Sequence, residues 1–129
     1  MSEPIIYIDR SDVCEGKLAE LKLAIKELAD FVESNEAEII AYRVYLNEPG
    51  TQMTVLHIHP NSASLEFHME VGGPAFSRFK DLIRISVIDI YGAPSEQLRK
   101  QLTEKARLLG SGTVTVHEFR AGFVRLDLG

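Results

Sequence analysis

The strand-like segments of this chain are apolar on both sides, and this constrains its fold more than any other feature. A sheet with helices on one face and water on the other should alternate apolar and polar residues. Residues 5–8 and 37–46 do not alternate in this way. In residues 82–91 the pattern predicts two apolar faces, one with Ile83, Ile85, Val87 and Tyr91 and the other with Leu82, Ile88 and Ile90. We therefore expect both faces of the sheet to be covered.

The order of the segments narrows the fold further. Strands are predicted at residues 5–8, 37–46, 53–59 and 82–91, with a turn over residues 47–50 that joins the second to the third. Helices are predicted after the first and third strands, which gives the order β-α-β-β-α-β. This order is that of ferredoxin-like folds, whose sheet is mainly antiparallel.

The limits of the two helices are predicted from caps and breakers. Asp12 and Glu15 form a capping box that starts the first helix, and Asn35 ends it. The second helix should begin at Asn61 or Ser62 and end at Val71, because the sequence Gly-Gly-Pro follows. A further helical turn is expected over residues 75–80.

Residues 92–129 extend this core. Ser95 should cap a third helix that ends at Gly110, and strands are predicted at residues 113–119 and 123–128. We interpret residues 1–129 as one α+β domain, since its 129 residues suit a single core. The prediction is a ferredoxin-like βαββαβ fold with an extra C-terminal helix and one or two strands.

The two-faced strands predict a partner. Two short helices can cover only one side of the sheet, so a second protomer packed on the other side would give a homodimer through the sheet face. The alternative is that residues 92–129 fold over that face within one chain.

Composition excludes several classes of function. A net charge of −5 and a pI near 5.3 argue against nucleic-acid binding. No run approaches the roughly 20 apolar residues that cross a bilayer, and the N-terminal residues do not resemble a signal peptide. We therefore expect a cytoplasmic protein without membrane contact. Cys14 is the single cysteine, so one chain forms no disulfide.

His68 is the strongest candidate for chemistry. Glu66 and Glu70 mark the wet side of the second helix, and His68 falls opposite them, toward the sheet. A histidine in a helix–sheet cleft is suited to proton transfer because its pKa lies near neutrality. The alternative is a structural histidine that is hydrogen-bonded inside the core.

The other histidines are weaker candidates. His57 and His59 share one face of a strand, and His117 lies on a strand with Thr113 and Thr115. His57 and His59, followed by Glu66 and the distant His117, have some likeness to the metal motif of cupins, but the spacing does not match. We expect no metal, with a metalloprotein that uses His57 and His59 as the remote alternative.

The stretches Val55–Ser64 (Val-Leu-His-Ile-His-Pro-Asn-Ser-Ala-Ser) and Leu65–His68 (Leu-Glu-Phe-His), with this order of elements, resemble antibiotic-biosynthesis-monooxygenase-type domains of the dimeric α/β-barrel superfamily. The resemblance covers roughly residues 5–91. It implies two protomers packed sheet against sheet, and a helix that carries a histidine into the cleft, here His68. Members include cofactor-independent oxygenases of aromatic substrates. Haem-degrading members rely on a tryptophan, which this chain lacks.

The resemblance leads to a first functional hypothesis and two alternatives. The first is a monooxygenase-like enzyme without a cofactor, acting on a small aromatic or quinone-like molecule. His68 would accept a proton from a phenolic hydroxyl, and the expected substrate-binding residues are Tyr42, Tyr45, His59 and His117. The first alternative is a non-catalytic dimer that binds a small molecule or another protein, and the second is the metalloprotein.

Overall fold

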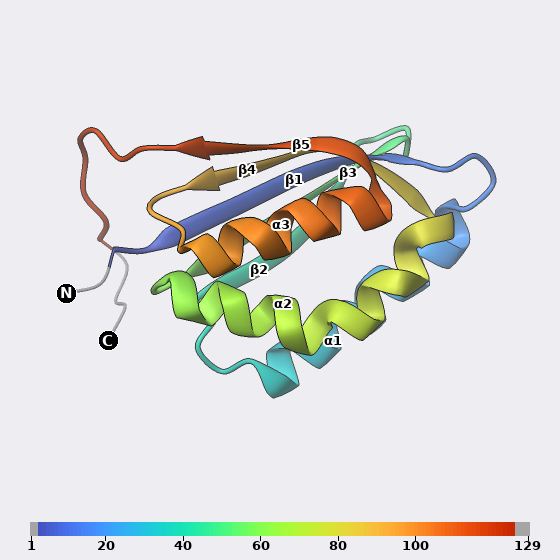
Figure 1. The fold of residues 1–129 in the computed structure, drawn as a ribbon. Helices are drawn as coiled ribbons and strands as arrows, with labels where there is room; N and C mark the ends of the chain where they lie inside the picture. Colours follow the sequence, from blue (N-terminus) through green and yellow to red (C-terminus); the bar gives the residue numbers. More distant parts are fainter. Residues whose placement is uncertain (1–2, 126–129) are drawn as a thin grey trace.

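A computed structural model describes residues 3–125 of the chain, which form a five-stranded sheet with helices packed on one face (Figure 1). Along the chain, the elements are β1 (Ile5–Val13), α1 (Leu18–Asn35), β2 (Ala41–Leu46), β3 (Gln52–His59), α2 (Ser62–Phe76), the 3₁₀ helix η1 (Ser77–Asp81), β4 (Ile83–Tyr91), α3 (Glu96–Leu109) and β5 (Gly110–His117). No helix among the described residues is long and apolar enough to span a membrane.

The strand order is β2-β3-β1-β4-β5. β1 pairs antiparallel with both β3 and β4, and β2 pairs antiparallel with β3. The first six elements therefore form the predicted ferredoxin-like arrangement. β5 joins β4 in parallel, because α3 carries the chain back along the sheet before β5 begins. The sheet is thus mixed, with a mainly antiparallel centre.

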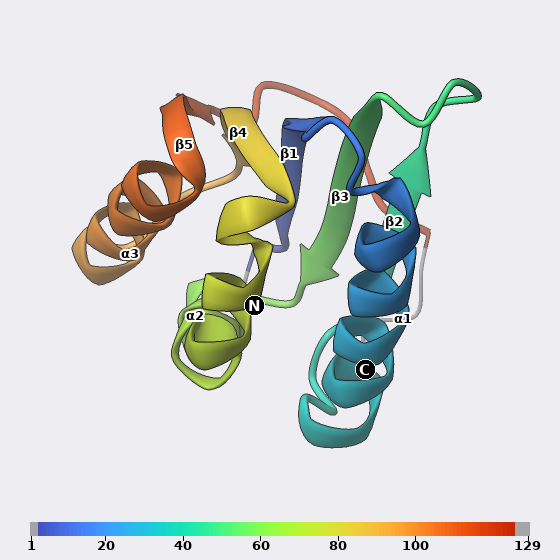
Figure 2. The same cartoon turned by 90° about the vertical axis from the view of Figure 1, so that its right-hand side faces the viewer.

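Helices α1, α2 and α3 all lie on the same side of the sheet (Figure 1). Figure 2 shows α3 beside α2, whereas α1 lies apart from α2 beneath β2. The core fills the space between helices and sheet and includes Leu21, Leu65, Ile90 and Leu102, each fully buried. The predicted alternative was that residues 92–129 cover the opposite face. Their described part, residues 92–125, does not do so, because α3 joins the helix layer and β5 extends the edge of the sheet.

A β-bulge corrects the predicted faces of β4. The register shifts between Arg10 and Ser11 on β1, where Ser11 pairs with Ile85 and Arg10 with Val87. Ile85 therefore faces the helices, whereas Val87 and, beyond it, Tyr91 face away, although the strict alternation placed them together. Ile83 and Ile85 before the bulge and Ile88 and Ile90 after it all reach the core.

Two of the predicted helix boundaries, the start of the first helix and the end of the second, are wrong. Asp12 does not cap α1: it lies in β1, which runs to Val13, and α1 begins at Leu18. α2 does not end at Val71 but continues through the Gly-Gly-Pro sequence to Phe76. Packing explains this, because Gly72 is buried against the Phe76 ring, 3.2 Å from where a β-carbon would lie. The caps at Asn61 and Ser95 are confirmed.

The C-terminal extension docks through hydrogen bonds between two helix starts. The Ser95 hydroxyl donates to Glu66 Oε2 over 2.7 Å, and the Ser95 amide donates to the Ser62 hydroxyl over 3.0 Å. The predicted strand at residues 113–119 is present as β5, shifted toward the N-terminus. Residues 123–125 are not in a strand, and residues 126–128 of that prediction lie outside the described part of the chain.

The face of the sheet that points away from the helices stays partly exposed. Ile6, Ile8, Leu56 and Ile58 lie on it side by side, and each is only half-buried. No helix of the described residues covers this face (Figure 1). The apolar second face predicted from the sequence is therefore present and uncovered in a single chain.

Candidate functional site

Polar side chains gather in the core between the sheet and the helices. Such groups are seldom buried without a partner, because removal from water costs free energy unless hydrogen bonds replace those lost. The cluster comprises Tyr7, Asp9 and Ser11 of β1, Glu36 after α1, His57 and His59 of β3, Ser64 and His68 of α2 and Lys105 of α3, all nearly inaccessible to solvent. So many buried polar groups in one small core mark a candidate functional site.

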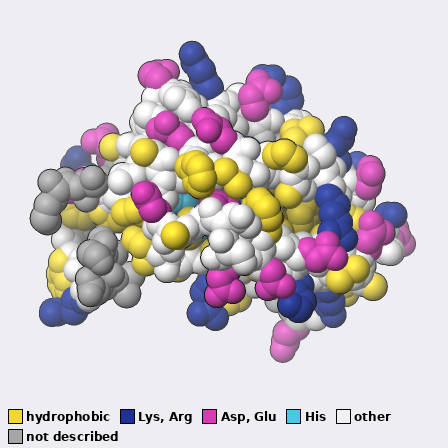
Figure 3. All heavy atoms as spheres, turned by 90° about the horizontal axis from the view of Figure 1, so that it is seen from below, with side chains coloured by type: hydrophobic (Ala, Val, Ile, Leu, Met, Phe, Trp, Pro, Cys, Tyr) yellow, Lys and Arg dark blue, Asp and Glu magenta, His cyan; other side chains and the backbone are white. Residues whose placement is uncertain are grey.

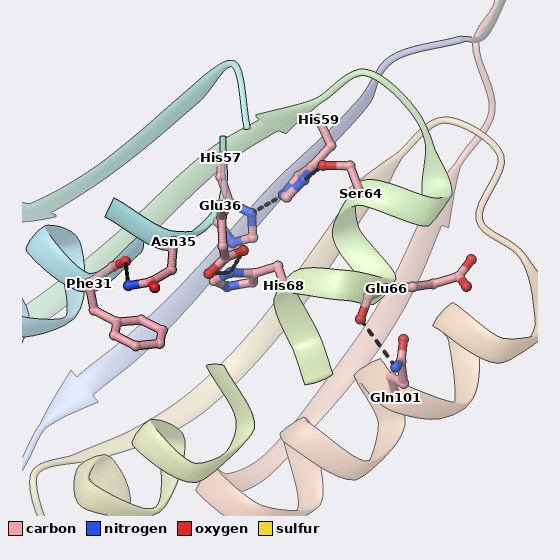
Figure 4. Close-up of polar contacts among 9 residues, drawn as sticks. All are labelled: Phe31, Asn35, Glu36, His57, His59, Ser64, Glu66, His68 and Gln101. Carbon is pink, nitrogen blue, oxygen red and sulfur yellow. Dashed lines mark hydrogen bonds and ion pairs between the residues drawn. The ribbon is translucent and has the colours of Figure 1, made fainter. Parts of the chain in front are cut away.

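His68 and Glu36 form a buried pair (Figure 4). His68 Nδ1 lies 2.8 and 3.0 Å from the two carboxylate oxygens of Glu36. A carboxylate only accepts hydrogen bonds, so Nδ1 carries the hydrogen and Nε2 has the free lone pair. Burial lowers the pKa of His68, although the Glu36 hydrogen bond and charge oppose that shift. The neutral ring is therefore set up to accept a proton at Nε2.

A second hydrogen-bonded chain runs from β3 to the start of α2. His57 Nδ1 lies 2.6 Å from His59 Nε2, and His59 Nδ1 lies 2.8 Å from the Ser64 hydroxyl. Burial lowers the pKa of His59 to about 3 and that of His57 well below its usual value. His57 Nε2 is buried and has no partner among the described residues. Because each link can reverse with the tautomers, the chain could carry a proton between Ser64 and His57.

The third part of the site joins β1 to the C-terminal extension. Lys105 Nζ donates to the Tyr7 hydroxyl over 2.7 Å and lies 3.5 Å from Asp9 Oδ2, to which the Tyr7 hydroxyl donates. Burial raises the pKa of Asp9, and the charge of Lys105 opposes this. Burial likewise lowers the pKa of Lys105, opposed by Asp9. Asp9 Oδ1 and the Ser11 hydroxyl are buried without a partner in the described structure.

A small cavity lies against this cluster. Its volume is about 30 Å³, and its polar wall is formed by Asp9, Tyr42 and Lys105. Phe76 and Phe79 close its other side together with aliphatic side chains. The space suits about one water molecule. Seen from the helix side, a histidine is visible only as a small patch among hydrophobic side chains (Figure 3).

A larger hollow of about 410 Å³ opens on the surface near the start of α2. Glu36 and Ser64 both line it, as does Phe67, whose side chain is exposed. Its wall thus includes one member of the His68–Glu36 pair and the outer end of the His57–His59–Ser64 chain.

The structure brings together three of the predicted site residues. The ring centroid of His68 lies 5.8 Å from that of Tyr42 and 6.0 Å from that of His59. Tyr45 and His117 lie on the opposite face of the sheet: Tyr45 is exposed beneath Arg43, and His117 bonds to Asp89. The two groups of predicted residues therefore do not form one pocket.

Six residues of the cluster were missed from the sequence: Tyr7, Asp9, Ser11, Glu36, Ser64 and Lys105. Tyr7, Asp9 and Ser11 carried a signal, because they follow Ile5 at alternate positions on the core face of β1. Lys105 carried a weaker one, since it lies in the apolar stripe of α3 beside Leu102 and Leu109. Glu36 and Ser64 gave no signal, because loop geometry and tertiary packing place them.

The histidine pair does not form part of a metal-binding group in the described structure. Within residues 3–125, no three His, Cys, Asp or Glu side chains come together in an arrangement that could hold a metal ion. His57 and His59 bond to each other, through Nδ1 of His57 and Nε2 of His59.

Solved structures share this fold at low sequence identity. MupZ from Pseudomonas fluorescens is 20% identical with a TM-score of 0.75, over 97% of this chain and 91% of that one. SnoaB from Streptomyces nogalater, described as a cofactor-independent oxygenase and solved as the N63A mutant, is 11% identical with a TM-score of 0.61, over 73% and 96%.

A protein from Bacteroides thetaiotaomicron, provisionally described as an antibiotic biosynthesis monooxygenase, is 16% identical with a TM-score of 0.56, over 73% of this chain and 90% of that one. No family model and no curated protein matches the sequence. The chain therefore has the antibiotic-biosynthesis-monooxygenase-type fold expected from the resemblance.

Proposed function

We propose that this protein is a cofactor-independent, monooxygenase-like enzyme that acts on a small aromatic or quinone-like molecule bound between the helices and the sheet. The observation that carries the proposal is the buried His68–Glu36 pair with its free Nε2. The fold shared with a cofactor-independent oxygenase supports it.

In this proposal His68 Nε2 accepts the proton of a phenolic hydroxyl. The Glu36 carboxylate fixes the ring through Nδ1 and stabilises the imidazolium that forms. His59 and Tyr42 line the approach to His68 and orient the ring of the ligand. The resulting anion donates electrons to O₂. One oxygen atom enters the product, and the other leaves as water with two hydrogens from the substrate.

A substrate enters only if the site opens. The cavity of about 30 Å³ is too small for an aromatic ring, and the surface hollow of about 410 Å³ beside Glu36 and Ser64 is the route that we propose. The same small volume favours the second candidate function, a non-catalytic dimer that binds a small molecule or a protein elsewhere. In that case His68 and Glu36 would have a structural role.

The charge of Glu36 is predicted to matter for the rate. Glu36→Gln keeps an acceptor for Nδ1 but removes the charge that stabilises the imidazolium. We expect kcat to fall by about 100-fold with little change in KM. The measurement is O₂ consumption with a panel of hydroquinones and naphthols. The matched control is Glu33→Gln, an exposed residue one turn earlier on α1.

Two outcomes would decide against the enzyme. One is a panel in which no member is oxidised while the protein is folded by circular dichroism. The other is oxidation by His68→Gln and Glu36→Gln at the rate of the parent. Either result would leave the non-catalytic candidate.

We further propose that two copies pack through the uncovered sheet face. Ile8→Glu puts a charge at the centre of this face and should weaken the dimer at least tenfold, because that charge would be buried without a partner. Sedimentation analysis over a range of protein concentrations measures the effect. Leu23→Glu is the control, since Leu23 is an exposed apolar residue on α1. A parent that is monomeric at about 100 μM, a concentration at which even a weak dimer is detected, would contradict the proposal.

A further inference from the structure

We infer that Asp9 is a second proton acceptor of this site and that its Oδ1 binds the hydroxyl of a neutral phenol or enol. This inference rests on the proposed function, in which such a hydroxyl enters the helix–sheet space. It assigns the contact to a carboxylate that β1 places in the wall of the cavity.

The two oxygens of Asp9 have different surroundings. Oδ2 accepts from the Tyr7 hydroxyl and lies 3.5 Å from Lys105 Nζ. Oδ1 is buried without a partner in the described structure, although Asp9 is only 2% exposed. An unmade hydrogen bond on a buried carboxylate costs free energy, so a donor from a ligand or a water molecule is needed there.

The neighbours of this oxygen select the ligand. Tyr42, Phe76 and Phe79 give the cavity aromatic walls. A carboxylate or phosphate ligand would meet the charge of Asp9 and would bring no hydrogen for Oδ1. A neutral ring with one acidic hydroxyl satisfies both the walls and the orphaned acceptor.

Lys105 is a positioning residue in this scheme, supplied by the C-terminal extension. It donates to the Tyr7 hydroxyl, and its ammonium lies 4.4 Å from the centroid of the Phe76 ring. His68 contacts the same ring, with centroids 5.8 Å apart. Lys105 Nζ and the His68 ring are therefore at most about 10 Å apart, from these two distances, which is the scale of one small aromatic molecule. The extension is thus part of the site.

Removal of the Lys105 charge should change the proton affinity of Asp9. The groups that face Asp9 from the packed elements are Tyr7 on β1, Tyr42 on β2, His57 on β3, His68 on α2 and Lys105 on α3. Lys105 lowers the pKa of Asp9 more than any of the others. We therefore expect Lys105→Met to raise the pKa of Asp9 further.

The experiment follows the ¹³Cγ resonance of Asp9 in the full chain by NMR. In the parent, excess phenol should shift this resonance, and benzoate should not. Lys105→Met should move the titration of Asp9 to higher pH, whereas Lys100→Met, an exposed lysine on the same helix, should leave it unchanged. The double variant Asp9→Asn/Lys105→Met removes both charges together and should stay folded but lose phenol binding.

The inference is overturned if phenol leaves the Asp9 resonance unmoved, which would mean that a water molecule alone satisfies Oδ1. It is also overturned if the double variant binds phenol like the parent. These measurements read ionisation and binding, not oxidation. Phenol binding at Asp9 without O₂ consumption would therefore keep this inference and reject the oxygenase.

Discussion

Replacement of Asp9 by asparagine is expected to lower the free energy of unfolding by about 3–5 kcal/mol at pH 7, because it leaves the charge of Lys105 buried without its partner. Lys105 Nζ lies 3.5 Å from Asp9 Oδ2, and both side chains are nearly inaccessible. An asparagine can still accept a hydrogen bond from Tyr7 but carries no charge. The loss comes from the uncompensated ammonium and not from a change in volume.

The deficit should shrink as the pH rises. Burial lowers the pKa of Lys105 below its usual value of 10.5, and without Asp9 the pKa falls further. Between the folded and unfolded pKa values the unfolded chain binds more protons, so stability rises with pH in that window by up to about 1.4 kcal/mol per unit. Urea unfolding of parent and variant from pH 7 to pH 10 measures the difference.

A double variant separates this cause from others. Asp9→Asn/Lys105→Met removes the buried charge and should recover most of the loss, and its stability should no longer carry the pH dependence that the Lys105 ammonium causes above pH 7. The interpretation would fail if the double variant were as unstable as the single one. The hydrogen bonds of Asp9 would then outweigh the ion pair.

The fold could be predicted because its signals are distributed along the chain. The helical spacing of α1 and the turn at residues 47–50 each specify one element, and their order leaves few topologies. The errors fell where tertiary packing overrides local preference. Asp12 is held in β1 by its pairing with Gln52, and Gly72 stays helical because Phe76 packs against it.

The site was predictable only where one element carried the signal. His68 faces the sheet because the wet side of its own helix defines the opposite side. The pairing of His68 with Glu36 joins residues 32 positions apart, and the bond between Lys105 and Tyr7 joins residues 98 apart. No periodic pattern encodes such contacts. Tyr45 and His117 lie on strands that were predicted. The sequence did not indicate that both side chains face away from the helices.

As the pH is lowered, the protein is expected to unfold at a higher pH than most small domains do. Burial keeps His57 and His59 neutral in the folded chain, with the pKa of His59 lowered from 6.5 to about 3. As the pH falls below 6.5, the unfolded chain takes up protons that the folded chain does not. Each such histidine then removes up to about 1.4 kcal/mol per pH unit, which amounts to about 2 kcal/mol at pH 5 for His59 alone. His57 adds to this loss, so acid removes a substantial part of the roughly 5–15 kcal/mol that stabilises a typical domain.

The contribution of one histidine, His59, to this pH dependence can be measured separately. Asp9 acts in the opposite direction, because its raised pKa lets the folded chain bind a proton first, and this offsets part of the loss. His59→Gln keeps groups that can bond to Ser64 and His57 but cannot titrate. The slope of unfolding free energy against pH between 6.5 and 5 should therefore fall by about one proton, or 1.4 kcal/mol per unit. An unchanged slope would mean that His59 is protonated in the folded chain. The His57–His59–Ser64 chain would then hold a buried cation and could not exchange its hydrogens in the way proposed for neutral rings.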